Sequence, residues 1–163
     1  MDFNLVQNQM NRERANNAAY AAFAAALEDE NWPGFAAWMA KAAADEWSHY
    51  LKFRDYLIDR LQKPVLAALE APPNMDASNP VPLFRAALEL ERENTKSIVA
   101  LNAMSEAGED DIEDALFETW LIWGLDEQRN SERELTDAVL ELSRVENDPA
   151  GLLALDREYQ EKG

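Results

Sequence analysis

The 163-residue sequence has no cysteine and only one histidine, His49. Without cysteine there is no disulfide framework and no thiolate metal site. Basic residues are also scarce, because 15 Lys and Arg stand against 32 Asp and Glu, and the formal net charge is −17. Such a charge disfavours nucleic acid and anionic membranes as partners and concentrates cations nearby. We therefore expect small cations to be the natural ligands of this chain.

Long hydrophobic runs and a basic N-terminal leader are absent as well. The first ten residues contain no Lys or Arg, and no stretch approaches the ~20 consecutive apolar residues that a transmembrane helix needs. These features predict a cytoplasmic protein that neither binds nor crosses a membrane. A hydrophobic content of 47% is sufficient for one core, so residues 1–163 are predicted to form a single domain.

Glycine and proline are few, and their positions divide the chain into helices. The segment from Lys63 to Pro82 holds most of the 7 prolines, which predicts an extended connector without a helix of its own. The other segments carry apolar residues at alternating spacings of three and four, as a helix buried on one face requires. The predicted helices cover residues 3–31, 34–61, 82–106, 110–144 and 149–160.

These elements predict an all-α fold, namely an antiparallel four-helix bundle with a long crossover between helices 2 and 3 and a short fifth helix. The first two helices are expected to form a hairpin that turns at residues 31–34, and the next two a hairpin that turns near Gly108. The short helix has a largely one-sided apolar face, which we expect to be buried where subunits meet. This face consists of Leu152, Leu153, Leu155 and Tyr159.

Polar residues interrupt the apolar face of each long helix. The second helix carries Glu46 and His49, which share a face because they are three residues apart. At ~1.5 Å per residue from the first turn, Glu13 lies level with His49, and the same count from the second turn brings Glu91 level with Gln128 to within about one helical turn. Both hairpins thus place polar residues at one level of the predicted core.

Three carboxylates at this level, Glu13, Glu46 and Glu91, need compensation. Burying them would cost several kcal/mol per charge, and no Lys or Arg lies on the four apolar faces nearby. A pair of divalent metals would compensate, and carboxylates with one imidazole suit iron or manganese better than copper, although zinc competes. A core of protonated carboxyl groups without metal is the alternative. Gly124 costs about 1 kcal/mol relative to Ala in mid-helix; either close packing or room beside the site would explain it, and we expect close packing.

As a set, these residues resemble the ferroxidase centre of ferritins, and the likeness in helix lengths and connector extends over nearly the whole chain. Inward-pointing Glu and Glu-x-x-His residues are a known pattern of ferritin-like bundles. The resemblance implies that Glu13, Glu46 and His49 bind a first iron. It also implies that Glu46 bridges to a second iron held by Glu91, and that Gln128 lies beside this second iron.

Three further residues take roles from the same resemblance. Tyr20 is similar to the tyrosine that stands next to the ferroxidase centre. Asp45 and Glu127 are similar to residues that help to hold a third, inner iron in bacterial ferritins. Haem is not expected, because Trp47 stands where bacterioferritins have a haem-ligating methionine and Ser131 where they have a second histidine.

The function that the resemblance implies is iron storage and detoxification. A ferritin of this kind is a ferroxidase that oxidises two Fe(II) per subunit with dioxygen or hydrogen peroxide and stores Fe(III) mineral inside a homo-oligomeric cage of 24 subunits. Three alternatives stay open. They are a di-iron carboxylate enzyme, a miniferritin-type peroxide-protection protein and a metal-free structural bundle.

Overall fold

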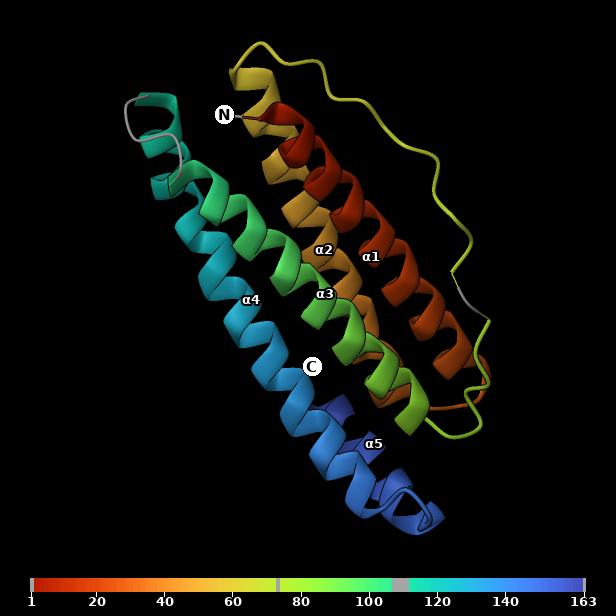
Figure 1. Ribbon diagram of the computed structural model, residues 1–163. Helices are drawn as coiled ribbons and strands as arrows, with labels where there is room; N and C mark the ends of the chain where they lie inside the picture. Colours follow the sequence, from red (N-terminus) through yellow and green to blue (C-terminus); the bar gives the residue numbers. More distant parts are fainter. Residues whose placement is uncertain (1, 73, 107–111, 163) are drawn as a thin grey trace.

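Helices account for the secondary structure of the computed structural model, which describes residues 2–72, 74–106 and 112–162. Within these ranges the helices are α1 (Phe3–Asp29), α2 (Pro33–Asp59), α3 (Val81–Glu106), α4 (Ile112–Arg144) and α5 (Pro149–Lys162). The four long helices lie side by side as a bundle (Figure 1), which confirms the predicted all-α class. No helix in this part of the chain is long and apolar enough to cross a membrane.

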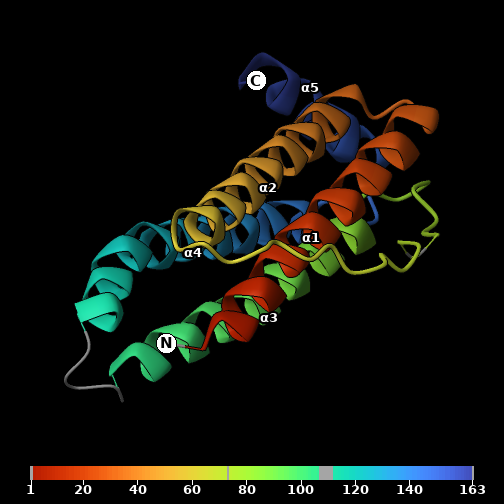
Figure 2. The ribbon, with the colours of Figure 1, turned by 90° about the horizontal axis from the view of Figure 1, so that it is seen from above.

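The bundle is made of two antiparallel hairpins, α1 with α2 and α3 with α4 (Figures 1 and 2). Helices α2 and α3 run in the same direction, so the connector between them extends along the outside of α1 (Figure 1). Side-chain amides of α1 fix it there. Gln7 accepts a hydrogen bond from the backbone N–H of Val65 at 2.9 Å, and the Asn11 amide donates to the carbonyl of the same residue at 2.9 Å.

Helices α1 and α2 both end earlier than predicted, for the same backbone reason. Asn31 and Leu61 have φ values of 61° and 57°, so the last helical residues are Asp29 and Asp59 rather than residues 31 and 61. In each case the following N–H closes the helix by bonding to a carbonyl of the last turn, as Trp32 does to Leu27 at 2.9 Å. The predicted start of the fourth helix at residue 110 and the turn near Gly108 lie outside the described residues.

The apolar face of α5 is largely buried against its own chain. The prediction that this face is buried where subunits meet is therefore wrong for most of it. Leu152 is buried in the core of its own chain, and the Tyr159 ring lies 5.1 Å from that of Phe35 and 6.1 Å from that of Phe84. Only Leu153, at 43% exposure, faces outward among the large hydrophobic residues of this helix. The reason is that the end of α4 turns back and places α5 on the start of α2.

A polar layer divides the hydrophobic core of the bundle. One apolar cluster occupies the end of the bundle near α5 and includes Phe23, Phe35 and Phe84, while another occupies the opposite end and includes Phe53 and Phe117. The residues between them on all four long helices include buried polar side chains. These are Gln9, Glu13, Asn16, Glu46, His49, Glu91, Asn94 and Gln128. The predicted polar level is therefore present inside the bundle.

Candidate metal centre

Glu13 from α1 and Glu46 and His49 from α2 form a compact group of potential metal ligands. Their exposed fractions are 1%, 3% and 9%, and one ligand atom from each residue lies within 4.8 Å of the others. The His49 Nδ1 atom is 3.8 Å from a Glu13 oxygen and 3.9 Å from a Glu46 oxygen. Hairpin formation by α1 and α2 thus brings together the three residues that the sequence predicts to hold the first metal.

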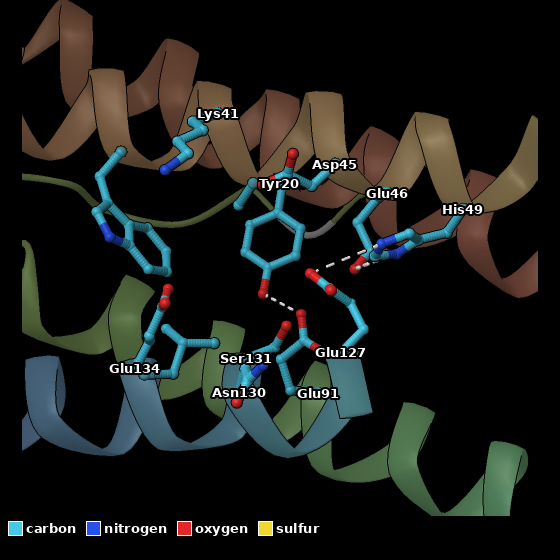
Figure 3. A pocket seen from close by; sticks show the side chains of 13 residues that line it. Tyr20, Lys41, Asp45, Glu46, His49, Glu91, Glu127, Asn130, Ser131 and Glu134 are labelled. Carbon is cyan, nitrogen blue, oxygen red and sulfur yellow. Dashed lines mark hydrogen bonds and ion pairs between the residues drawn. The ribbon is translucent and has the colours of Figure 1, made fainter. Parts of the chain in front are cut away.

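Glu91 reaches the same layer from α3 and is held by Tyr20 from α1. The Tyr20 hydroxyl donates a hydrogen bond to the Glu91 carboxyl group at 2.6 Å. In Figure 3 the Tyr20 ring points across the bundle to Glu91, next to Glu46 and His49. Glu91 is only 3% exposed, so this hydrogen bond orients a carboxyl group that has little contact with solvent.

A pocket of about 180 Å³ connects this group with the surface between α2 and α4 (Figure 3). Asp45 and Glu127 both line it, and a Glu127 oxygen lies 4.0 Å from the His49 Nε2 atom. Asp45 is exposed and Glu127 half-buried. Lys41, one helical turn before Asp45, also lines the pocket. The pocket therefore has acidic walls with a cationic side chain among them.

The buried carboxyl groups differ in their protonation. Burial raises the pKa of Glu46 well above its ordinary value, and the neighbouring Glu13 raises it further. Burial acts in the same direction on Glu13, but the neighbouring His49, Glu46 and Gln9 outweigh it and lower the pKa of Glu13. Two adjacent carboxyl groups cannot both ionise easily in a buried site. The metal-free pair therefore keeps its proton on Glu46.

Burial also favours the protonated forms of Glu91 and Tyr20. Burial raises the pKa of Glu91, although hydrogen bonds from Tyr20 and Gln128 oppose this effect. Burial also raises the pKa of Tyr20, and the charge of Glu91 adds to the shift. The Tyr20 hydroxyl consequently stays protonated and acts as a donor.

The donor set fits a hard metal ion. One Glu46 oxygen, Oε2, is buried and has no hydrogen-bond partner in the described part of the chain. A buried, unpartnered carboxyl oxygen is costly, and it belongs to the carboxyl group whose other oxygen, Oε1, lies 3.9 Å from the His49 Nδ1 atom. A cation bound there would satisfy it. Carboxylate oxygens with one imidazole suit iron or manganese.

The sequence prediction missed three buried amides of the layer, namely Gln9, Asn16 and Asn94. Gln9, at 0% exposure, donates to Glu13 at 2.5 Å, and Asn94, at 1% exposure, donates to Gln128 at 3.0 Å. The next residue of α3, Thr95, is only half-buried and bonds to Glu132 outside the layer. The signal was present in the spacing, because Gln9 precedes Glu13 by four residues and Asn94 follows Glu91 by three.

Known proteins resemble this chain in both sequence and structure. It is 31% identical over 153 residues to the bacterial non-heme ferritin of Staphylococcus epidermidis. The matched region covers 94% of this chain and 89% of that protein. The bacterial non-heme ferritin of Staphylococcus aureus matches with the same identity and coverage. Among solved structures, the open-pore ferritin of Archaeoglobus fulgidus has 28% identity and a TM-score of 0.88, covering 96% of this chain and 93% of that one.

The family model described as "Ferritin-like domain" matches residues 3–145. This range contains α1 to α4 and all the residues of the candidate metal centre. An engineered closed form of the Archaeoglobus fulgidus ferritin also superposes with a TM-score of 0.88, at 28% identity, over 96% of this chain and 92% of that one. The chain belongs to the ferritin family.

Proposed function

We propose that this protein stores iron and that it oxidises Fe(II) at the centre formed by Glu13, Glu46, His49 and Glu91. The observation that carries the proposal is the buried group of Glu13, Glu46 and His49, whose ligand atoms lie within 4.8 Å of one another beside an unpartnered Glu46 oxygen. Family membership supports iron as the metal. Hard carboxylate oxygens also favour Fe(III) over Fe(II), which assists the loss of an electron.

In this proposal two Fe(II) ions are the substrates and each gives up one electron. Dioxygen takes both electrons and two protons to leave as hydrogen peroxide, and hydrogen peroxide as the oxidant would leave as two waters. Glu46 would give up its proton when iron binds, and together with Glu13, His49 and Glu91 it would hold the two ions. Tyr20 keeps Glu91 in place, because its hydroxyl donates to the Glu91 carboxyl group at 2.6 Å. Gln128 lies beside the second ion.

The proposal extends to the fate of the oxidised iron. Asp45 and Glu127 line the pocket that leads out of the centre, and they are the residues that would hold a third iron on its way to the mineral. The mineral would form inside a homo-oligomeric cage of 24 subunits in the cytoplasm. The centre requires no haem, and a net charge of −17 supports cations rather than nucleic acid or membranes as partners.

Aerobic addition of Fe(II), followed by near-ultraviolet absorbance, tests the proposal. The wild-type protein should oxidise Fe(II) much faster than buffer does. Glu46→Ala should slow this oxidation by about 100-fold or more, since loss of a bridging ligand exceeds the ~10–100-fold effects of outer groups. Asp55→Ala, which removes an exposed carboxylate from the same helix, is the matched control and should oxidise Fe(II) normally.

Helix content measured by circular dichroism should be nearly the same in both variants. Rapid oxidation by Glu46→Ala would overturn the assignment of the centre. Oxidation by the wild-type protein at the rate of buffer would leave a metal-free structural bundle as the better description.

A further inference from the structure

A chain of three buried amides crosses the polar layer and joins the two halves of the candidate metal centre. The Gln9 Nε2 group donates to Glu13 at 2.5 Å and to the Asn94 carbonyl oxygen at 2.6 Å. The Asn94 Nδ2 group donates to the Gln128 carbonyl oxygen at 3.0 Å. The Gln128 Nε2 group in turn donates to the backbone carbonyl of Glu91 at 3.0 Å and to the Glu91 carboxyl group.

The direction of this chain is determined at both ends. The backbone carbonyl of Glu91 can only accept a hydrogen bond, so the group of Gln128 that faces it must be the NH₂ group. At the other end, the Gln9 Nε2 group lies within hydrogen-bond distance of two oxygens, one of Glu13 at 2.5 Å and that of Asn94 at 2.6 Å, and only an NH₂ group can donate to both. Asn94 lies between them and has one arrangement that satisfies both neighbours, with its oxygen toward Gln9 and its nitrogen toward Gln128.

This arrangement has a consequence for the second metal. The resemblance implies that Gln128 lies beside that metal, but its amide oxygen accepts a hydrogen bond from Asn94. The part of Gln128 that faces Glu91 is a donor, which cannot coordinate a cation. Asn94 also lies 3.4 Å from a Glu13 oxygen, so one residue contacts both a ligand of the first metal and the amide beside the second.

We propose that Asn94 is a positioning residue that withholds the Gln128 amide oxygen from the second metal and thereby makes the second position the weaker one. The inference rests on the proposed function, since it concerns the same two metal positions. Gln128 then stabilises the carboxylate of Glu91 as a donor and is not itself a metal ligand. The weak second position follows from the hydrogen bonds of a residue that touches neither metal.

A double-mutant cycle of Asn94 and Gln128 tests this inference, with Co(II) titrated by calorimetry and by its visible absorbance. Asn94→Leu conserves size and frees the Gln128 oxygen to turn toward the second metal. The second dissociation constant should then fall about tenfold, the lower range for a change next to a ligand. Gln128→Leu in the wild-type background should weaken the second site modestly, because it removes a donor to Glu91 but no metal ligand, whereas in the Asn94→Leu background it should abolish the gain.

Two further variants complete the experiment. Thr95→Val changes the next residue of α3, which bonds to Glu132 rather than to the centre, and should leave both constants unchanged. Asn94→Asp keeps the acceptor for Gln9 and replaces the donor that faces Gln128. If Asn94→Leu does not fold, this variant tests whether the Gln128 amide rotates toward the second metal. In that variant the second site should again tighten more than the first.

The outcomes separate the inference from the proposed function. An unchanged or weaker second site in Asn94→Leu, or a gain that persists when Gln128→Leu is added, would overturn the role of Asn94. Co(II) binding involves no oxidation, so a wild-type protein that binds two Co(II) but fails to oxidise Fe(II) would overturn the proposed function and leave the inference standing. Binding of fewer than two Co(II) by the wild-type protein would overturn both.

Discussion

Glu13 and Glu46 are the same residue type in the same buried layer, yet their pKa values shift in opposite directions. Glu13 accepts hydrogen bonds from Gln9 and lies near His49, which favour its charged form. Glu46 has an oxygen without a partner and a charged neighbour, which favour its protonated form. A metal must therefore displace a proton from Glu46, so metal affinity should rise with pH.

The metal-free protein offers a direct test of this proton. The folded-state pKa of Glu46 is raised, so its contribution to stability is complete below the ordinary value of 4.5 and is lost as the pH rises through the raised pKa. Glu46→Gln imitates the protonated form without having to take up a proton on folding, and should stabilise the metal-free protein by about 1–4 kcal/mol at neutral pH, the range found when buried ion pairs are replaced by neutral residues. The gain should shrink toward pH 5.

Urea unfolding of chelator-treated protein at pH 5 and pH 7.5 measures this difference. Glu13→Gln is the matched control, because the pKa of Glu13 is lowered and its charge is stabilising. That variant should lose stability at neutral pH, where Glu46→Gln gains it. Equal effects of the two substitutions would show that the proton is not held on Glu46.

At the level of helices, two glycines have opposite surroundings. A Cβ atom on Gly34 would lie 1.8 Å from the backbone oxygen of Asp156 in α5, whereas one on Gly124 would meet its nearest neighbour, Leu121, at 3.6 Å. Close packing thus explains Gly34, and the same explanation, predicted for Gly124, is wrong there. Near Gly34 the buried Asp156 carboxylate accepts the backbone N–H of Phe35 at 2.9 Å and so stabilises the start of α2.

Alanine at the two positions should therefore have opposite effects. Gly34→Ala forces α5 away from α2 and should destabilise the protein by about 1–3 kcal/mol, as overpacking does. Gly124→Ala makes ordinary contacts and should stabilise α4 by up to about 1 kcal/mol through helix propensity. Thermal unfolding measures both, at ~2–4 °C per kcal/mol. Destabilisation by Gly124→Ala would show that the space beside Leu121 and Ile98 is not available to a methyl group.

At the scale of the whole molecule, charge opposes assembly. Each chain carries a formal charge of −17, so subunits in the proposed cage repel one another over distances set by the Debye length. The apolar residues of α5 are largely buried within their own chain, as the low exposure of Leu152 shows. Contacts between subunits must therefore come mainly from other surfaces.

Ionic strength should control the size of the particle. Raising the salt concentration from about 10 mM to about 150 mM shortens the Debye length from ~30 Å to ~8 Å and screens the repulsion. The equilibrium should shift from smaller species toward the full cage, which sedimentation velocity measures directly. A particle that becomes smaller with added salt would show that attraction between charges, rather than apolar contact, holds the subunits together.

The sequence by itself determined the helices, their pairing and the level of the polar layer. Helical periodicity is a local property and the rise per residue is constant, so residues far apart in the chain, such as Glu13 and His49, could be placed at one depth. Tyr20 was predicted from resemblance, and the structure adds its hydrogen bond to Glu91.

Only the tertiary structure decided how the side chains of that layer divide their hydrogen bonds and protons. The direction of the chain from Gln9 through Asn94 to Gln128 depends on which atoms of three helices meet within about 3 Å. The proton on Glu46 depends on its distance from another charge and from water. The return of α5 onto Gly34 depends on an approach between backbones of two distant segments. Periodicity along a single helix carries none of these distances.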